Sequence, residues 1–387
     1  MITRHTARLL LLGVLLVTTS TQPVFLVGAS FFQIGPELGI GPVGLGLLTA
    51  AFFLTSSVSS PLAGRWVQRV GWRRAMRVNC VASAAVMAST AVAARSAWSL
   101  AGFLMAAAAV YGMANPAANM ALAAHTDPVR AATVFGIKHA GIPGSTLLAG
   151  LAVPVVVIGF GWRASFAVSA VLAALVWLLI PRSEREVHAG FGSQPRRGVP
   201  LDRSRLIGLA VASGLGATAA TALGTYLVSA AIDTGMSETG AGLLQSVGSA
   251  ISILARIVVG IGVDRRQAGG VRGLFLLFGG GAVTFAALTG ANGWVFVILV
   301  VVAYATGWGW PGLMTFTVVD ANRGTAAASS SVVQAGVFVG AGATPIVLGA
   351  AVERWGFDAV WVIVAAALLA GAGVARFIGR DAAADRV

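Results

Sequence analysis

Apolar runs of about 20 residues recur along the whole chain, separated by short polar stretches rich in Gly, Pro and Arg. A helix of about 20 residues, rising ~1.5 Å per residue, crosses a hydrocarbon core of ~30 Å. Strands of a membrane barrel would instead alternate apolar and polar positions over about ten residues. The pattern therefore predicts an all-α membrane protein with twelve transmembrane helices, at residues 9–33, 43–64, 75–94, 98–122, 131–158, 163–181, 206–231, 239–262, 272–290, 293–318, 325–350 and 357–376.

Composition agrees with the pattern and excludes several classes of function. Of the 387 residues, 57% are hydrophobic and 10% charged, whereas a soluble domain carries about 25% charged residues. The single cysteine excludes an internal disulfide framework, the four histidines are scattered without metal-ligand spacing, and no two carboxylates meet within a predicted span. We therefore expect a bilayer-embedded monomer that is not an enzyme, binds no metal or nucleic acid, and uses no cofactor except a coupling proton.

The placement of basic residues predicts the topology. With both termini in the cytoplasm, only Arg95, Arg163 and Arg354 of the 26 Lys and Arg residues lie in outer loops, and two lie within spans. This agrees with the positive-inside rule. The scarcity of Lys beside abundant Arg, Ala and Gly is typical of a GC-rich bacterial genome, so we expect a location in the bacterial inner membrane.

The chain also repeats itself. Gly64 and Arg69 match Gly260 and Arg265 at a shift of 196 residues. Matches at a shift of 195 join Gly112 to Gly307, Pro116 to Pro311, Gly141 to Gly336 and Gly161 to Gly356. A near-constant shift across several spans indicates a duplication, and because each copy holds six spans, both have the same orientation in the membrane. We expect an N-terminal six-helix bundle at 1–181, a charged cytoplasmic linker at 182–205 and a C-terminal bundle with a short tail at 206–387.

A glycine and arginine motif follows the second span and has a partial copy in the second half. The first copy, GRWVQRVGWRR, holds Gly64, Gln68, Arg69, Gly71, Arg73 and Arg74, and the second, GIGVDRR, holds Asp264 and Arg265. With twelve spans and a 6+6 duplication, this motif resembles the signature of the major facilitator superfamily. The resemblance implies two bundles that alternate access to a central site, a tight turn at the motif glycines, and charges that latch the halves together. Gln68 replaces the family's Asp, which predicts a weaker latch in the first half.

Two cations lie inside predicted spans. Lys138, the only lysine, lies in span 5 eight residues after Arg130, and Arg256 lies in span 8 eight residues before Asp264. Both are about 12 Å deep at helical rise. No acid lies in either span to neutralise them, so a substrate anion is the expected partner. The alternatives are that Arg256 snorkels to the surface and that Lys138 bonds only to helix carbonyls. An arginine on span 8 also resembles monocarboxylate-type members of the superfamily, whose acid one turn earlier is replaced here by Ser252.

Further polar residues are candidates for the substrate path. His139 follows Lys138 and aligns with Gln334 in the second half. It could carry a coupled proton, because its unperturbed pKa is about 6.5, or it could hydrogen-bond between helices. Asn115, Asn119 and Tyr226 complete the predicted binding set. We expect Pro116, Pro143, Pro311 and Pro345 to break their helices, and Trp308 and Trp310 to form either an aromatic gate or part of the interfacial belt.

These features predict a secondary active transporter of a small anion that works by alternating access, with proton symport. One alternative is a proton-coupled exporter of drugs or metabolites, although the thirteen acids all lie in loops, tails or span ends. An alternative from another class is a membrane sensor that binds a ligand without moving it. A channel is the third, and no re-entrant filter segment is visible.

Overall fold

The structure is a computed structural model that describes residues 4–123, 131–181, 202–266, 270–322 and 326–384. Every regular element in these residues is helical, and twelve helices are long and apolar enough to cross a membrane. The number of spans predicted from the sequence is therefore confirmed.

The first six spans come from the N-terminal half of the chain. They are α1 (Arg4–Ala29), α3 (Pro42–Val70), α4 (Trp72–Ala93), α5 (Ala97–Ala123), a broken fifth span of α6 (Ala131–Lys138), α7 (Gly141–Ala152), η2 (Val153–Val157) and α8 (Ile158–Phe160), and α9 (Trp162–Leu179). The short helix α2 (Phe31–Leu38) joins the first two spans.

The second six spans follow the linker. They are the combined α10 (Arg203–Thr221), η3 (Ala222–Tyr226) and α11 (Leu227–Asp233), then α12 (Glu238–Arg266), α13 (Gly270–Leu288), the broken α14 (Gly293–Thr306) and α15 (Pro311–Ala321), α16 (Ala326–Trp355) and α17 (Phe357–Ala384). Most linker residues, 182–201, lie outside the described part of the chain.

Several predicted boundaries are wrong, and those at the ends of α3 and α12 are wrong for a common reason. The first helix ends at Ala29 rather than residue 33, whereas α3 continues to Val70 and α12 to Arg266. Apolar runs mark only the hydrocarbon core, and Arg and Gln favour helix almost as well as Leu. A helix therefore continues through its polar end until a residue such as Gly71, with φ +81°, stops it.

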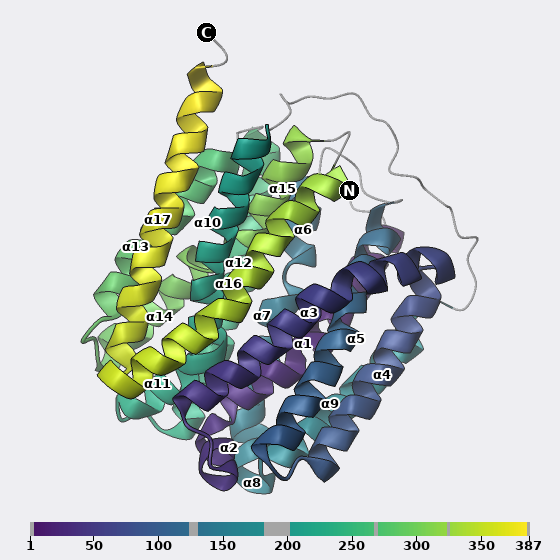
Figure 1. Cartoon of the computed structure of the whole chain (residues 1–387), viewed down its shortest axis with the longest axis vertical. Coiled ribbons are helices and arrows are strands. Elements are labelled where there is room, and N and C mark those ends of the chain that lie inside the picture. Colours follow the sequence, from purple (N-terminus) through teal and green to yellow (C-terminus); the bar gives the residue numbers. More distant parts are fainter. Residues whose placement is uncertain (1–3, 124–130, 182–201, 267–269, 323–325, 385–387) are drawn as a thin grey trace.

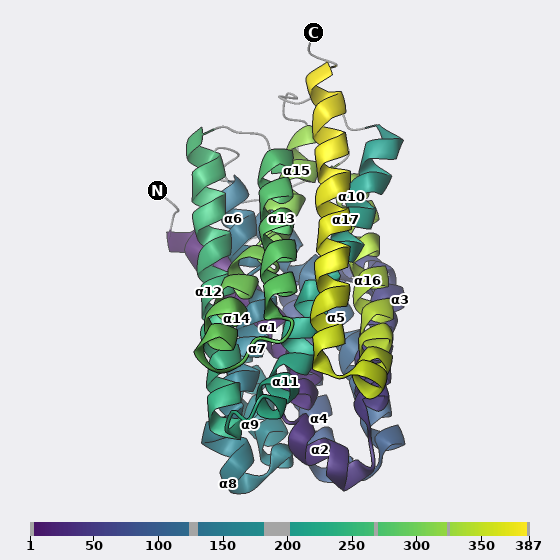
Figure 2. The same cartoon turned by 90° about the vertical axis from the view of Figure 1, so that its left-hand side faces the viewer.

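Helices α1 to α9 pack mainly on one another, as do α10 to α17, except that α6 and α12 pack mainly on the other half. Both chain termini lie at the same end of the molecule (Figures 1 and 2). We call this end the termini face and the other, which carries α2 and α8, the opposite face. The halves meet along two seams, α3 against α16 and the broken fifth span against α12.

Small residues let the backbones approach at these seams. A Cβ atom on Gly46 would lie 2.2 Å from the carbonyl oxygen of Pro345, and one on Gly150 would lie 2.5 Å from that of Gly242. Lipid tails are as apolar as leucine, so helices in a membrane associate through close packing rather than through hydrophobic burial. The seams are consistent with that requirement.

Exposed tryptophans indicate where the opposite face meets the lipid headgroups. Trp98 is the second residue of α5 and is 88% exposed, and Trp294 is the second residue of α14 and is 81% exposed. Amphipathic rings of this kind collect at the membrane interface. Arg65, Arg69 and Arg74 are exposed at the other end of the spans.

Only two of the four predicted proline breaks are present. The fifth span is interrupted between Lys138 and Gly141, just before Pro143, and the tenth between Thr306 and Pro311. Pro116 and Pro345 lie inside the continuous helices α5 and α16, so the breaks predicted there are wrong. In a membrane bundle, neighbouring helices and local adjustments can satisfy the backbone groups that a proline frees.

Candidate substrate site and gates

Arg256 lies in the middle of α12, is 2% exposed, and points its guanidinium at the two helix breaks. Its Nε and Nη2 donate to the carbonyl oxygen of Trp308 at 3.2 and 2.8 Å, and Nη1 donates to the carbonyl oxygen of His139. The guanidinium carbon also lies 5.6 Å from the centre of the Trp308 ring. The structure therefore contradicts the alternative that Arg256 snorkels towards the surface.

Both carbonyls are available because their helices are interrupted. An intact helix would pair the carbonyl of His139 with the N–H of residue 143, but that residue is a proline and has none. Trp308 lies in the break between α14 and α15, where carbonyls lack an intrahelical partner. Arg256 thus ties the second half of the chain, through α12, to the fifth span of the first half.

Lys138 is the last residue of α6 and is 7% exposed. Its ammonium group makes no hydrogen bond or ion pair to any other residue in the described part of the chain. A buried ammonium without a partner is costly in a membrane interior. Of the two predicted cations, Lys138 is thus the one whose charged group has no partner among the described residues.

His139 links the same two breaks through its side chain. Its Nε2 lies 3.0 Å from the Thr315 hydroxyl of α15, and either atom can donate, depending on the tautomer.

Trp308 and Trp310 are both buried. The centre of the Trp308 ring lies 6.4 Å from that of Phe25 and 5.7 Å from that of Tyr304. The alternative that these tryptophans belong to the interfacial belt is therefore wrong.

The structure brings only part of the predicted binding set together. Arg256 bonds to the backbone carbonyl of His139, and Lys138 is the residue before His139 in the chain. Asn115 donates to the Tyr111 hydroxyl at 3.2 Å within α5, and Asn119, one turn on, is exposed. Gln334 is half-buried on α16.

Tyr226 has different neighbours from the other predicted binding residues. Its hydroxyl donates to the carbonyl oxygen of Pro345 at 2.7 Å and lies 3.4 Å from that of Pro42. These contacts place it at the seam between α3 and α16, near the opposite face.

Sequence reasoning missed Thr315 and the role of Ser252. The Ser252 hydroxyl donates to the carbonyl oxygen of Trp308 at 3.3 Å, the same atom that Arg256 binds. The spacing could have predicted this, because residues four apart share a helix face. The sequence around Thr315 does not predict its contact, because its partner His139 comes from the other half.

The motif residues are arranged differently from the predicted loop. Gly71, with φ +81°, makes the tight turn between α3 and α4. Gly64 lies inside α3, so its predicted place in a turn is wrong; its nearest neighbour is Pro116, whose Cγ would be 3.9 Å from an added Cβ. The helix continues past Gly64 because the residues that follow favour helix.

The motif arginines are at the surface of the termini face. Gln68, Arg69, Arg74 and Arg265 are exposed, and none makes a hydrogen bond or ion pair to another residue in the described ranges. The guanidinium of Arg73 stacks 4.6 Å from the Trp72 ring.

Asp264, in contrast, spans the two halves. Its carboxylate accepts hydrogen bonds from the backbone N–H groups of Ala132 at 3.2 Å and Thr133 at 2.9 Å, and from the Thr133 hydroxyl. These groups form the first turn of α6, where N–H groups lack intrahelical partners and negative charge is favoured. The geometry is that of a carboxylate of one half capping a helix of the other.

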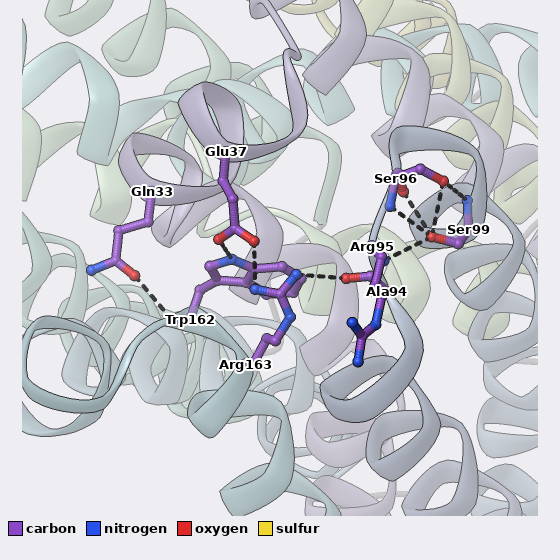
Figure 3. A network of polar contacts seen from close by, with 8 residues as sticks. All are labelled: Gln33, Glu37, Ala94, Arg95, Ser96, Ser99, Trp162 and Arg163. Atoms are coloured by element: carbon purple, nitrogen blue, oxygen red, sulfur yellow. Dashed lines mark hydrogen bonds and ion pairs between the residues drawn. The ribbon is translucent and has the colours of Figure 1, made fainter.

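A second polar network holds the opposite face of the first half together (Figure 3). Glu37 of α2 accepts from the indole N–H of Trp162 at 2.7 Å and pairs with Arg163 at 2.6 Å, and Arg163 also donates to the carbonyl oxygen of Ala94. The Trp162 hydrogen bond and the Arg163 guanidinium lower the pKa of Glu37. Gln33 accepts from the Trp162 backbone N–H at 2.9 Å. The network joins α2, α9 and the turn between α4 and α5.

Comparison with known proteins agrees with this architecture. The family model described as Major Facilitator Superfamily matches residues 10–334, which is most of the chain. No curated protein matches this chain significantly. With twelve apolar helices and two packed halves, the match is decisive for the family: the chain belongs to the major facilitator superfamily of membrane transporters.

Proposed function

We propose that this transporter moves a small anion across the membrane by alternating access, with Lys138 as the residue that binds the anion directly. The observation that carries the proposal is that Lys138 is a buried residue whose ammonium has no partner in the described part of the chain. An anion brought by the substrate would supply the missing charge and accept a charge-assisted hydrogen bond.

Arg256 has a different role in this proposal. Three of its hydrogen bonds already go to the backbone at the two helix breaks. Two of its five N–H donors remain for a ligand. We infer that it positions the fifth and tenth spans around the anion and adds positive charge to the site.

The charge distribution supports a proposal for the orientation of the protein in its membrane. We propose that the termini face is cytoplasmic, because exposed arginines gather there, and that the membrane is a bacterial inner membrane. Residues 1–181 and 206–387 would act as the two moving bundles. His139, hydrogen-bonded across the halves to Thr315, is the candidate carrier of a symported proton.

The test is uptake by proteoliposomes of a panel of labelled solutes that includes small monocarboxylates, dicarboxylates, inorganic anions and amines. The proposal expects accumulation of an anion, its loss in Lys138→Gln, and its retention in Arg272→Ala, which removes an exposed arginine of α13. An imposed pH gradient should increase uptake in the wild type and not in His139→Gln.

Other results would select the rival functions. Accumulation of amines, or solute efflux dependent on the pH gradient, would indicate an exporter. Saturable binding with no movement of any bound solute would indicate a sensor. Either result contradicts the proposal.

A further inference from the structure

The N-terminus of α3, on the opposite face, lacks a cap from its own half. The residue at the cap position is Gly41, which has no side chain, and Pro42 at the first helical position has no N–H. The first backbone donor is therefore Val43, and its N–H donates to Oε1 of Glu353 at 3.0 Å. Glu353 lies near the end of α16, so the cap is supplied by the other half of the protein.

A buried contact adjoins this cap. The Tyr226 hydroxyl, from the second half, donates to the Pro345 carbonyl at 2.7 Å and lies 3.4 Å from that of Pro42. The backbones are close enough that a Cβ on Gly349 would lie 2.6 Å from the Pro42 carbonyl oxygen. Separation of α3 from α16 at this end must therefore break the hydrogen bond of Glu353 as well.

We propose that Glu353 is a latch that closes the opposite face. Its carboxylate stabilises the N-terminus of α3 only while the two halves touch, so its interaction energy belongs to the closed conformation alone. A negative charge at a helix N-terminus is favourable because N–H groups there lack partners. An interaction present in one of two conformations shifts the population towards it. Glu353 thus sets how often the site opens towards the opposite face.

The test measures directly how the protein divides between conformations closed and open at the opposite face. It needs no substrate, so its outcome is independent of the anion proposal. Spin labels at Arg95→Cys in the first half and Thr239→Cys in the second, in a Cys80→Ser background, report the separation of the halves on the opposite face by pulsed electron resonance. Both labelled positions are exposed, and Cys80 is the chain's single cysteine. Glu353→Gln should increase the ratio of long-distance to short-distance conformers by about two- to fivefold.

Two further variants separate a latch from a general loss of stability. Asp358→Asn is the matched control, because Asp358 also accepts from a backbone N–H on this face, that of Gly290 at 2.9 Å, but within one half. Gly41→Ser gives α3 a cap of its own. The Cβ of the new serine would lie 3.0 Å from Oε1 of Glu353. The serine should therefore displace the Glu353 carboxylate and shift the conformational population as Glu353→Gln does. The latch is refuted by an unchanged distance distribution in Glu353→Gln or by an equal shift in Asp358→Asn.

Discussion

Replacement of Arg256 by alanine should loosen the protein at its two helix breaks. The variant removes three hydrogen bonds and the contact with the Trp308 ring. The Trp308 carbonyl keeps one donor, the Ser252 hydroxyl. The His139 carbonyl loses the guanidinium and cannot regain an intrahelical bond, because residue 143 is proline.

The expected cost can be built from these parts. One buried carbonyl left without a donor costs about 1–3 kcal/mol, and a desolvated cation–π contact contributes about 0.5–2 kcal/mol. The free energy of unfolding of Arg256→Ala should therefore fall by about 2–4 kcal/mol. Arg256→Lys should lose about half as much, because one ammonium can reach one carbonyl and the ring but cannot bridge both carbonyls.

The assay is thermal and denaturant unfolding of purified protein in one detergent, with Arg272→Ala as the control. Loss of this exposed arginine should change stability by less than about 0.5 kcal/mol. If Arg256→Ala is as stable as the control, the guanidinium does not hold the breaks together, and its assigned positioning role is wrong.

Three further outcomes follow from other contacts. Gly336→Ala should destabilise the second half by about 1–3 kcal/mol in the same unfolding assay, because its Cβ would lie 2.0 Å from the Ala210 carbonyl oxygen. Gly373→Ala is the control and should leave stability unchanged, because its Cβ would meet nothing within 4 Å. Asp264→Asn should accelerate amide hydrogen exchange at the start of α6 by roughly fivefold or more, and exchange at the wild-type rate would count against the cap. The pKa of Glu37 is lowered on folding, so its contribution is present above the ordinary carboxyl pKa and lost as pH falls through the lowered value. Wild type should therefore exceed Glu37→Gln in stability at pH 7 and match it near pH 2, and a gap that persists at low pH would contradict the ion-pair account.

The fold could be predicted because its causes are local. Each span is a continuous apolar run, and backbone groups in lipid can be satisfied only within a helix or a closed barrel. The turn at Gly71 was also visible, since a glycine between two helical segments permits positive φ. Span ends were less predictable, because Arg and Gln beyond the apolar run extend the helix by several residues.

The site could be predicted only in part because its contacts join distant segments. Lys138 and Arg256 were found from the cost of burying charge, which is a property of each residue alone. The partners of Arg256 are backbone carbonyls exposed by the helix breaks, and a carbonyl carries no residue signature. Glu353 resembled any charged residue at the end of a span, and only its contact with Val43 gives it a role.

The most direct test of the central claim is the equilibrium affinity of the purified protein for its best small anion, measured by calorimetry in wild type and Lys138→Gln. The loss of one charge-assisted hydrogen bond, about 1.5–3 kcal/mol, should weaken binding at least about tenfold. Equal affinity in the two proteins, or tight binding of cations instead, would contradict the assignment of Lys138 as the anion-binding residue.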